Sequence, residues 1–308
     1  LLAVSVLVGA ADITFTAASG ACLKGLVRPA DLLVANSRLE STNWTAVMLG
    51  PPLGGAAIGL LGPVTTVLAN AVSFLLSACG IRAMGGTEPA PRQQRGEPAG
   101  GLLAGWRYLL GHRALRPLFY NTVLVNGLIM ATAPLLAVLM LGRLGFAPWQ
   151  YGLAFALPSL GGLLGSRLAV RLVARFGRHR VLLATGTARA CWSEPLAFVR
   201  PGVAGLALVM AVEFGLICCA SVFNPVYSSY RLEQIDTHRL ARTLSAWSVT
   251  GKAGVAALTA LWGVLAGLIG LRPAIGLAGL LLLASPLLLP RQDRPAGAEP
   301  ELVAAQAG

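Results

Sequence analysis

The stretch Gly50-Pro51-Pro52-Leu53-Gly54-Gly55 lies inside an apolar run from about Trp44 to Leu61. The run is long enough to cross a bilayer. Two adjacent prolines and two adjacent glycines would break a helix in a soluble protein. In a membrane bundle, neighbouring helices can satisfy the freed backbone groups, and small residues let a second helix approach closely. The stretch therefore predicts a kinked transmembrane helix, either as a packing feature alone or as part of a moving element.

The composition of the whole chain favours an all-α polytopic membrane protein. Of the 308 residues, 56% are hydrophobic and only 12% are charged, whereas a soluble domain has about 25% charged residues. The net charge of +12 does not indicate nucleic-acid binding, because the basic residues form short clusters between apolar runs. We therefore expect the lipid bilayer, and no nucleic acid, as the surroundings of this chain.

Apolar runs predict nine transmembrane helices. They are Leu1–Leu23, Trp44–Leu61, Pro63–Ile81, Leu118–Leu141, Trp149–Val170, Val181–Val199, Val203–Tyr227, Thr243–Ile269 and Pro273–Leu289. The predicted organisation is three helices in residues 1–83, a cytoplasmic linker in 84–116 and six helices in 117–290. Within the linker, Gly101–Arg116 has the pattern of an interfacial amphipathic helix. A disordered cytoplasmic tail is expected in 291–308.

Basic residues are distributed unequally between alternate connections. The connections Lys24–Thr42, Arg82–Pro117, Arg167–Arg180 and Arg231–Arg242 hold most of them, and the opposite connections hold only Arg143, Arg200 and Arg272. The positive-inside rule therefore places the basic connections and the carboxyl terminus in the cytoplasm. Residue 1 is then expected outside, which fits an odd number of preceding helices.

An internal repeat supports the same interpretation. Shifting the sequence by 208 residues aligns Phe15 with Phe223, Gly55 with Gly263 and Gly59 with Gly267. The repeat predicts two related six-helix halves, of which the first lacks three helices here. Such repeats are typical of secondary transporters.

Three segments resemble a known family when they are taken together: Leu26–Asn36, Gly50-Pro51-x-x-Gly54-Gly55 and Ala71–Phe74. They resemble the major facilitator superfamily, and within it the branch of drug and siderophore exporters that includes macrolide efflux proteins. By this resemblance the chain corresponds to helices four to twelve of a twelve-helix bundle and is truncated at its amino terminus. Gly50, Pro51, Gly54 and Gly55 match the core of the antiporter motif on the family's fifth helix.

A second motif of the family lies in the connection that follows residue 165. Its residues are Gly165, Arg171, Arg175, Gly177, Arg178 and Arg180. The family pattern has an acidic residue near the start of this loop, whereas Arg167 and Arg171 occupy that region here. A charge-relay gate built within this loop is therefore in doubt.

Charged side chains inside the predicted spans are costly and are candidates for function. Asp12 and Glu213 lie on helices that the resemblance implies to be cavity-lining. A carboxylate in a low-dielectric cavity can take up and release a proton near neutral pH, and it can attract a cationic substrate. Lys252 is a buried cation for which Glu213 is one possible partner. Arg189 is more consistent with a structural pair, and a carboxylate held permanently by a basic partner is the alternative for both acids.

Asn126 is a candidate for substrate contact on a cavity-lining helix, with helix–helix hydrogen bonding as its alternative.

Other residue patterns exclude several classes of function. Phosphate-binding loops, metal-ligand clusters and nucleophile motifs are all missing from the sequence. The five cysteines show no disulfide or metal-binding spacing. We therefore expect no enzyme activity, no metal and no cofactor.

The expected function is secondary active transport. The first hypothesis is a monomeric, proton-coupled exporter of amphipathic small molecules in the cell membrane, working by alternating access. The alternatives are a permease for lipid-like or nutrient solutes, and a membrane scaffold or sensor that keeps only the fold. The 308-residue chain alone is expected not to transport, because part of the cavity wall would be missing.

Overall fold

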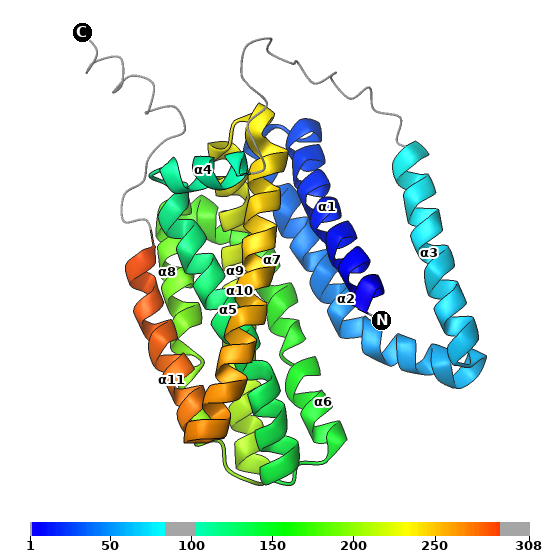
Figure 1. The fold of residues 1–308 in the computed structure, drawn as a ribbon, viewed down its shortest axis with the longest axis vertical. Coiled ribbons are helices and arrows are strands. Elements are labelled where there is room, and N and C mark those ends of the chain that lie inside the picture. The colour runs from blue at the N-terminus through cyan, green and yellow to red at the C-terminus, as the bar shows by residue number, and fades with distance from the viewer. Residues whose placement is uncertain (1, 84–102, 290–308) are drawn as a thin grey trace.

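The computed structural model describes residues 2–83 and 103–289, and within these ranges the chain is helical without any strand (Figure 1). The predicted tail and most of the predicted linker lie outside the described residues. The α-helices are α1 (Leu2–Leu26), α2 (Leu32–Leu61), α3 (Pro63–Ala83), α4 (Ala104–Gly111), α5 (Leu115–Ala137), α6 (Pro148–Ala156), α7 (Ser159–Phe176), α8 (Arg178–Cys191), α9 (Val203–Gln234), α10 (Leu240–Ile269) and α11 (Leu271–Ala284). A π-helix, Val138–Arg143, extends α5. Short 3-10 turns cover Pro29–Asp31, Glu194–Phe198, Thr237–Arg239 and Ser285–Leu288.

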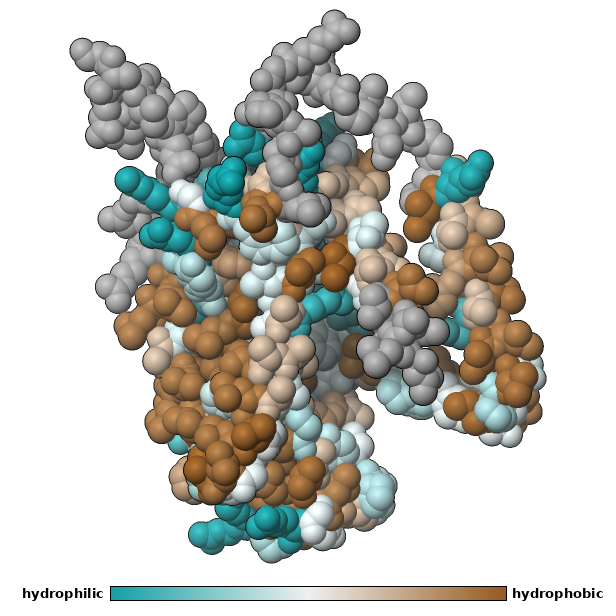
Figure 2. Space-filling model, in the orientation of Figure 1, coloured by the Kyte–Doolittle hydropathy of each residue, from teal (hydrophilic) through white to brown (hydrophobic). Residues whose placement is uncertain are grey.

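Seven stretches in the described part are long and apolar enough to cross a membrane. The expected count of nine is therefore not confirmed. The two remaining predicted spans fall on α1, which has 25 residues, and on α8, which has 14. The predicted span Trp149–Val170 is divided between α6 and α7, with a turn at Leu157 and Pro158. Figure 2 shows the hydrophobic sides and the hydrophilic ends expected of a membrane bundle.

Helices α5–α11 form one bundle in which glycines allow close helix contacts. A Cβ atom on Gly165 would clash with the Cys218 carbonyl of α9, and one on Gly161 would meet the Phe214 carbonyl of the same helix. At Gly127 of α5 it would clash with Leu258 of α10. Gly161 and Gly165 thus mark close contacts between α7 and α9. These contacts fix the positions of α7, α9 and α10, on which the functional site depends.

The first three helices meet this bundle unequally. Helix α1 packs on α10, and the first part of α2 packs on α7 and α9, whereas α3 stands apart beside α2 (Figure 1). Helix α2 contains Pro51 and Pro52 and bends strongly before it reaches α3. The kink is thus present, but the expected close approach is not. A Cβ atom on Gly50, Gly54 or Gly55 would have no neighbour within 4 Å among the described residues.

Helix α4 differs from the expected interfacial helix Gly101–Arg116. It has 8 residues and packs against the start of α10, where a Cβ atom on Gly105 would clash with the Arg242 carbonyl. Leu109 is fully buried, and Trp106 Nε1 donates a hydrogen bond of 2.8 Å to Thr250 Oγ1. The amphipathic pattern of this segment therefore reflects packing against one end of the bundle.

Candidate functional site

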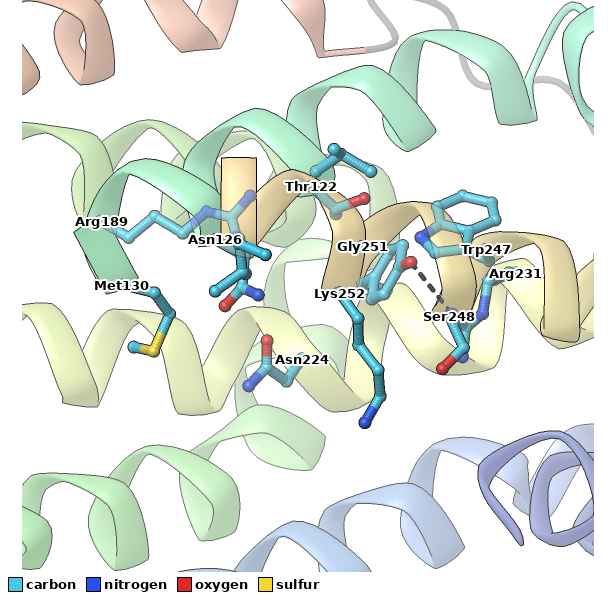
Figure 3. A pocket seen from close by; sticks show the side chains of 14 residues that line it. Thr122, Asn126, Met130, Arg189, Asn224, Arg231, Trp247, Ser248, Gly251 and Lys252 are labelled. Atoms are coloured by element: carbon cyan, nitrogen blue, oxygen red, sulfur yellow. Dashed lines mark hydrogen bonds between the residues drawn. The ribbon is translucent and has the colours of Figure 1, made fainter. Parts of the chain in front are cut away.

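A cavity of about 560 Å³ lies on the side of the bundle that faces α1 and α2. It is lined by residues of α5, α8, α9 and α10: Thr122, Val123, Asn126, Met130, Arg189, Asn224, Tyr227, Arg231, Trp247, Ser248, Gly251, Lys252, Val255 and Ala256 (Figure 3). Its volume is within the range of pockets for small organic molecules, roughly 300–1,000 Å³. The lining combines a few polar groups with apolar and aromatic side chains, which is typical of such sites.

Lys252 connects the cavity to the first helices of the chain. Its Nζ atom donates a hydrogen bond to Oδ2 of Asp12 in α1, and the two groups form an ion pair. In Figure 3 the Lys252 side chain extends toward the helices drawn in blue. The suggested pairing of Lys252 with Glu213 is therefore wrong in this structure, and Lys252 is exposed and not buried as expected. Asp12 and Lys252 are brought together because α1 docks against α10.

Glu213 lies elsewhere on α9. It is 9% exposed and does not line the cavity. Cavity-lining Asn224 is about three turns further along the helix, at 3.6 residues per turn. The electrostatic neighbour of Glu213 is Tyr151 of α6. Within the described part of the chain, Glu213 has no ion pair, so a structural pairing does not explain this carboxylate.

Arg189 projects from α8 into the cavity lining. Arg189 is 6% exposed, and its Nη2 atom donates a hydrogen bond of 2.6 Å to Asn121 Oδ1. The guanidinium carbon lies 3.7 Å from the centre of the Phe223 ring. Asn121 in turn donates 2.8 Å to the carbonyl of Ser285. The expected structural pair is thus an amide and an aromatic ring, not a carboxylate.

A second guanidinium, Arg231, also reaches the cavity, although the sequence placed it in a cytoplasmic connection. Helix α9 continues to Gln234, so Arg231 follows Tyr227 by one helical turn. Its Nη1 atom donates 3.1 Å to the Tyr227 hydroxyl, and its guanidinium carbon lies 5.2 Å from the Trp247 ring centre. The aromatic residue four positions earlier was the signal in the sequence that could have indicated this arrangement.

Asn126 lines the cavity as an exposed side chain on α5. Within the described residues it forms no hydrogen bond between helices, so its amide is available to a ligand. Asn224 is the second amide of the lining, and its Nδ2 atom donates 2.9 Å to Glu40 Oε1 of α2. Glu40 also accepts a hydrogen bond of 3.0 Å from Trp44 Nε1. The sequence analysis did not single out Glu40, because it lies before the predicted span Trp44–Leu61.

The end of the bundle that carries the α1–α2, α7–α8 and α9–α10 connections is closed by contacts with α1 and α2. Lys24 Nζ donates to the Ile235 carbonyl, which follows α9. Asn36 Nδ2 donates 3.1 Å to Ser229 Oγ. The Oγ atoms of Ser41 and Ser166 are 2.7 Å apart.

Further along, the Trp44 ring covers Gly162, where a Cβ atom would clash with it. The cavity is therefore bounded at this end by direct contacts between the two groups of helices.

The loop motif has a partner outside its own connection. Arg178 Nη1 lies 2.5 Å from Oε2 of Glu233 at the end of α9. Gly177 has a φ of 83°, a conformation that favours glycine, and it separates α7 from α8. Arg171, Arg175 and Arg180 are exposed. Arg178 of the loop is thus paired with a carboxylate of α9, Glu233, which sequence spacing within the loop did not indicate.

The described residues contain no group of three or more His, Cys, Asp or Glu side chains that could hold a metal ion. The five cysteines are free thiols.

Apolar helices around a cavity with a few polar groups, and an ion pair beside it, form an arrangement found in membrane transporters. The model of the Major Facilitator Superfamily matches residues 1–228 and 127–307, so the chain belongs to this family. Members of the family are generally transporters and not enzymes. No curated protein matches the chain significantly.

Proposed function

We propose that the protein is a proton-coupled secondary transporter that exports amphipathic small molecules by alternating access. The observation that carries this proposal is the ion pair between Asp12 and Lys252, which joins α1 to α10 beside the cavity. The mixed polar and aromatic lining suits a molecule with one polar and one apolar part. The drug- and siderophore-exporter-like branch, the cell membrane and a cytoplasmic carboxyl terminus remain parts of this proposal, as does a monomeric state.

Alternating access requires contacts that can separate. The candidates are the contacts of α1 and α2 with α7 and α9 at the closed end, including Asn36–Ser229 and Ser41–Ser166. These are hydrogen bonds between small polar side chains, and each contributes only about 1 kcal/mol net. Rocking of α1–α3 against α5–α11 would break them together. By the positive-inside rule, the basic connections favour a cytoplasmic location for this end, and the arrangement would then be a state closed to the cytoplasm.

Proton coupling is assigned to Asp12. Protonation of its carboxylate would remove the charge that holds Lys252 and would weaken the contact between α1 and α10. The side chains of Lys252 and Asp12 are 46% and 54% exposed, so water and substrate can reach both groups. Glu213 is the second candidate, because it is a buried acid without an ion-pair partner among the described residues.

The alternative functions are transport of another class of solute and a membrane protein that does not transport. A permease for lipid-like or nutrient solutes would use the same cavity, and a scaffold or sensor would keep the cavity without moving solutes. Accumulation of three dyes in everted membrane vesicles separates these classes. The dyes are cationic ethidium, neutral phenylnaphthylamine and anionic carboxyfluorescein.

With the full-length gene expressed, we expect accumulation of at least one dye above empty-vector vesicles, with loss of that signal after addition of a protonophore. Accumulation that is insensitive to the protonophore would contradict proton coupling. No accumulation of any dye would favour the scaffold.

A further inference from the structure

The charges around the cavity do not balance. Its lining includes three cations, Arg189, Arg231 and Lys252, and no acidic residue. Asp12 is engaged by Lys252, and Glu40 is engaged by Asn224 and Trp44. Within the described residues, neither guanidinium therefore has a carboxylate partner. The cavity carries a positive charge that its own acids do not neutralise.

The hydrogen-bonding capacity of Arg189 is largely unused. A guanidinium has five N–H donors, and here one hydrogen bond, to Asn121, is made. The Nε atom is buried without a partner. Because Asn121 is held by the Ser285 carbonyl, its oxygen fixes the position of the guanidinium, and Arg189 lines the cavity without a carboxylate partner among the described residues.

Arg231 repeats this arrangement at another part of the lining (Figure 3). Its Nε atom is also buried without a partner, and its one hydrogen bond goes to the neutral Tyr227 hydroxyl. The Phe223 and Tyr227 rings are stacked, with centres 5.6 Å apart and planes at 10°. One guanidinium lies over Phe223 and the other over Tyr227. The two cations are therefore positioned by one aromatic stack.

The aromatic contacts do not compensate for the burial of Arg189 and the partial burial of Arg231. A cation–π contact contributes less than the burial of an unpaired ion costs. A bound anion would supply the missing charge and accept hydrogen bonds from the free donors. Planar, forked guanidinium groups suit carboxylate and phosphate oxygens in particular.

We infer that the cavity binds the anionic group of an amphipathic molecule through the guanidinium groups of its lining, Arg189 and Arg231, with the apolar part of the molecule against Met130, Trp247 and Val255. The anionic group is a carboxylate, a phosphate or a sulfonate. This inference rests on the proposed function in one respect, that the bound anion is the transported molecule. It reverses the expectation from Asp12 and Glu213 that the cavity attracts cations.

The test uses four probes with the same ring system and different head groups. Naphthoate and naphthyl phosphate are anions, naphthalenemethanol is neutral and naphthylmethylammonium is a cation. Their binding to the full protein in an uncharged detergent is measured by titration calorimetry. The variants are Arg231→Gln, Arg189→Gln and Arg189→Lys, with Arg143→Gln as a matched control, because Arg143 is exposed and does not line the cavity.

We expect the two anions to bind most tightly. Removal of either cavity guanidinium should weaken anion binding at least about tenfold, since a hydrogen bond to a charged group contributes about 1.5–3 kcal/mol. Arg143→Gln and the affinity for naphthalenemethanol should be unchanged. Arg189→Lys should retain part of the preference for anions. If Arg189→Gln fails to fold because Asn121 loses its donor, Arg231→Gln still tests whether the cavity binds anions.

Three results would overturn the inference: equal affinity for the neutral and anionic probes, tightest binding of the cation, or unchanged anion affinity in Arg231→Gln. Displacement of naphthoate by phosphatidylglycerol would support the anion site and assign it to a lipid head group. Binding without displacement assigns it to a soluble anion. Because binding needs no transport, anion binding without vesicle transport would refute the proposed function and not the site.

Discussion

Lys252 of α10 forms an ion pair with Asp12 of α1, and this pair links two helices that are far apart in the sequence. Its position beside the cavity means that a change in the charge of Asp12 alters both the cavity and the contact between the helices. The two groups are half exposed, so the pair contributes at most about 1 kcal/mol and can be broken when the helices move.

Exchange of the two charges tests the ion pair itself. Asp12→Lys or Lys252→Asp alone places two like charges together and should lower stability by about 1 kcal/mol, the upper range for exposed pairs. The double variant should recover most of this loss, because it restores an opposite pair with reversed positions. Thermal unfolding of the purified protein measures the effect. Additive losses in the double variant would show that the two side chains do not interact.

The closed end can be tested by a crosslink. Ser41→Cys with Ser166→Cys, in a protein whose five native cysteines are replaced by serine, should form a disulfide, because the two Oγ atoms are 2.7 Å apart. A protease site inserted in residues 84–102 reveals the crosslink, since the two fragments then remain joined until reductant is added. Transport should stop on oxidation and recover on reduction. Ser41→Cys with Ser193→Cys is the control, and equal crosslinking there would contradict the packing of α2 on α7.

Glycines of the two groups of helices should respond differently to added side chains. Gly165→Leu should destabilise the protein by about 3 kcal/mol or more, because the new side chain meets the α9 backbone at Cys218. Gly54→Leu should leave the unfolding temperature unchanged, because the position is open in this structure. It should nevertheless lower transport if the antiporter-type motif packs during the conformational change. Unchanged transport in well-folded Gly54→Leu would remove the motif from the mechanism.

The sequence predicted the helical class, because this class depends on local composition. It also identified Asp12 and Lys252 as candidates, because a charged side chain inside an apolar run is energetically costly and often functional. It did not predict their pairing, which depends on how α1 docks on α10. The proposed boundaries of the four chain regions remain predictions.

Two residues show why the rest of the site could not be read from local patterns. Arg231 was placed in a connection because the apolar run ends at Tyr227, yet α9 continues past it to Gln234. Glu213 satisfied the rule for functional charges, but its depth along α9 and its contact with α6 keep it away from the cavity. Helix ends and helix depth are set by packing, which hydropathy alone does not determine.

The central claim is that Asp12 carries the proton coupling of transport through this cavity. It is tested by comparing Asp12→Asn and Glu213→Gln in everted vesicles, with the exposed acid Asp31→Asn as control. We measure the accumulation of a transported dye with an imposed pH gradient and after its collapse. The account predicts that Asp12→Asn abolishes the gradient-dependent part, whereas Glu213→Gln and Asp31→Asn retain it. Loss in Glu213→Gln together with normal accumulation in Asp12→Asn would contradict the claim.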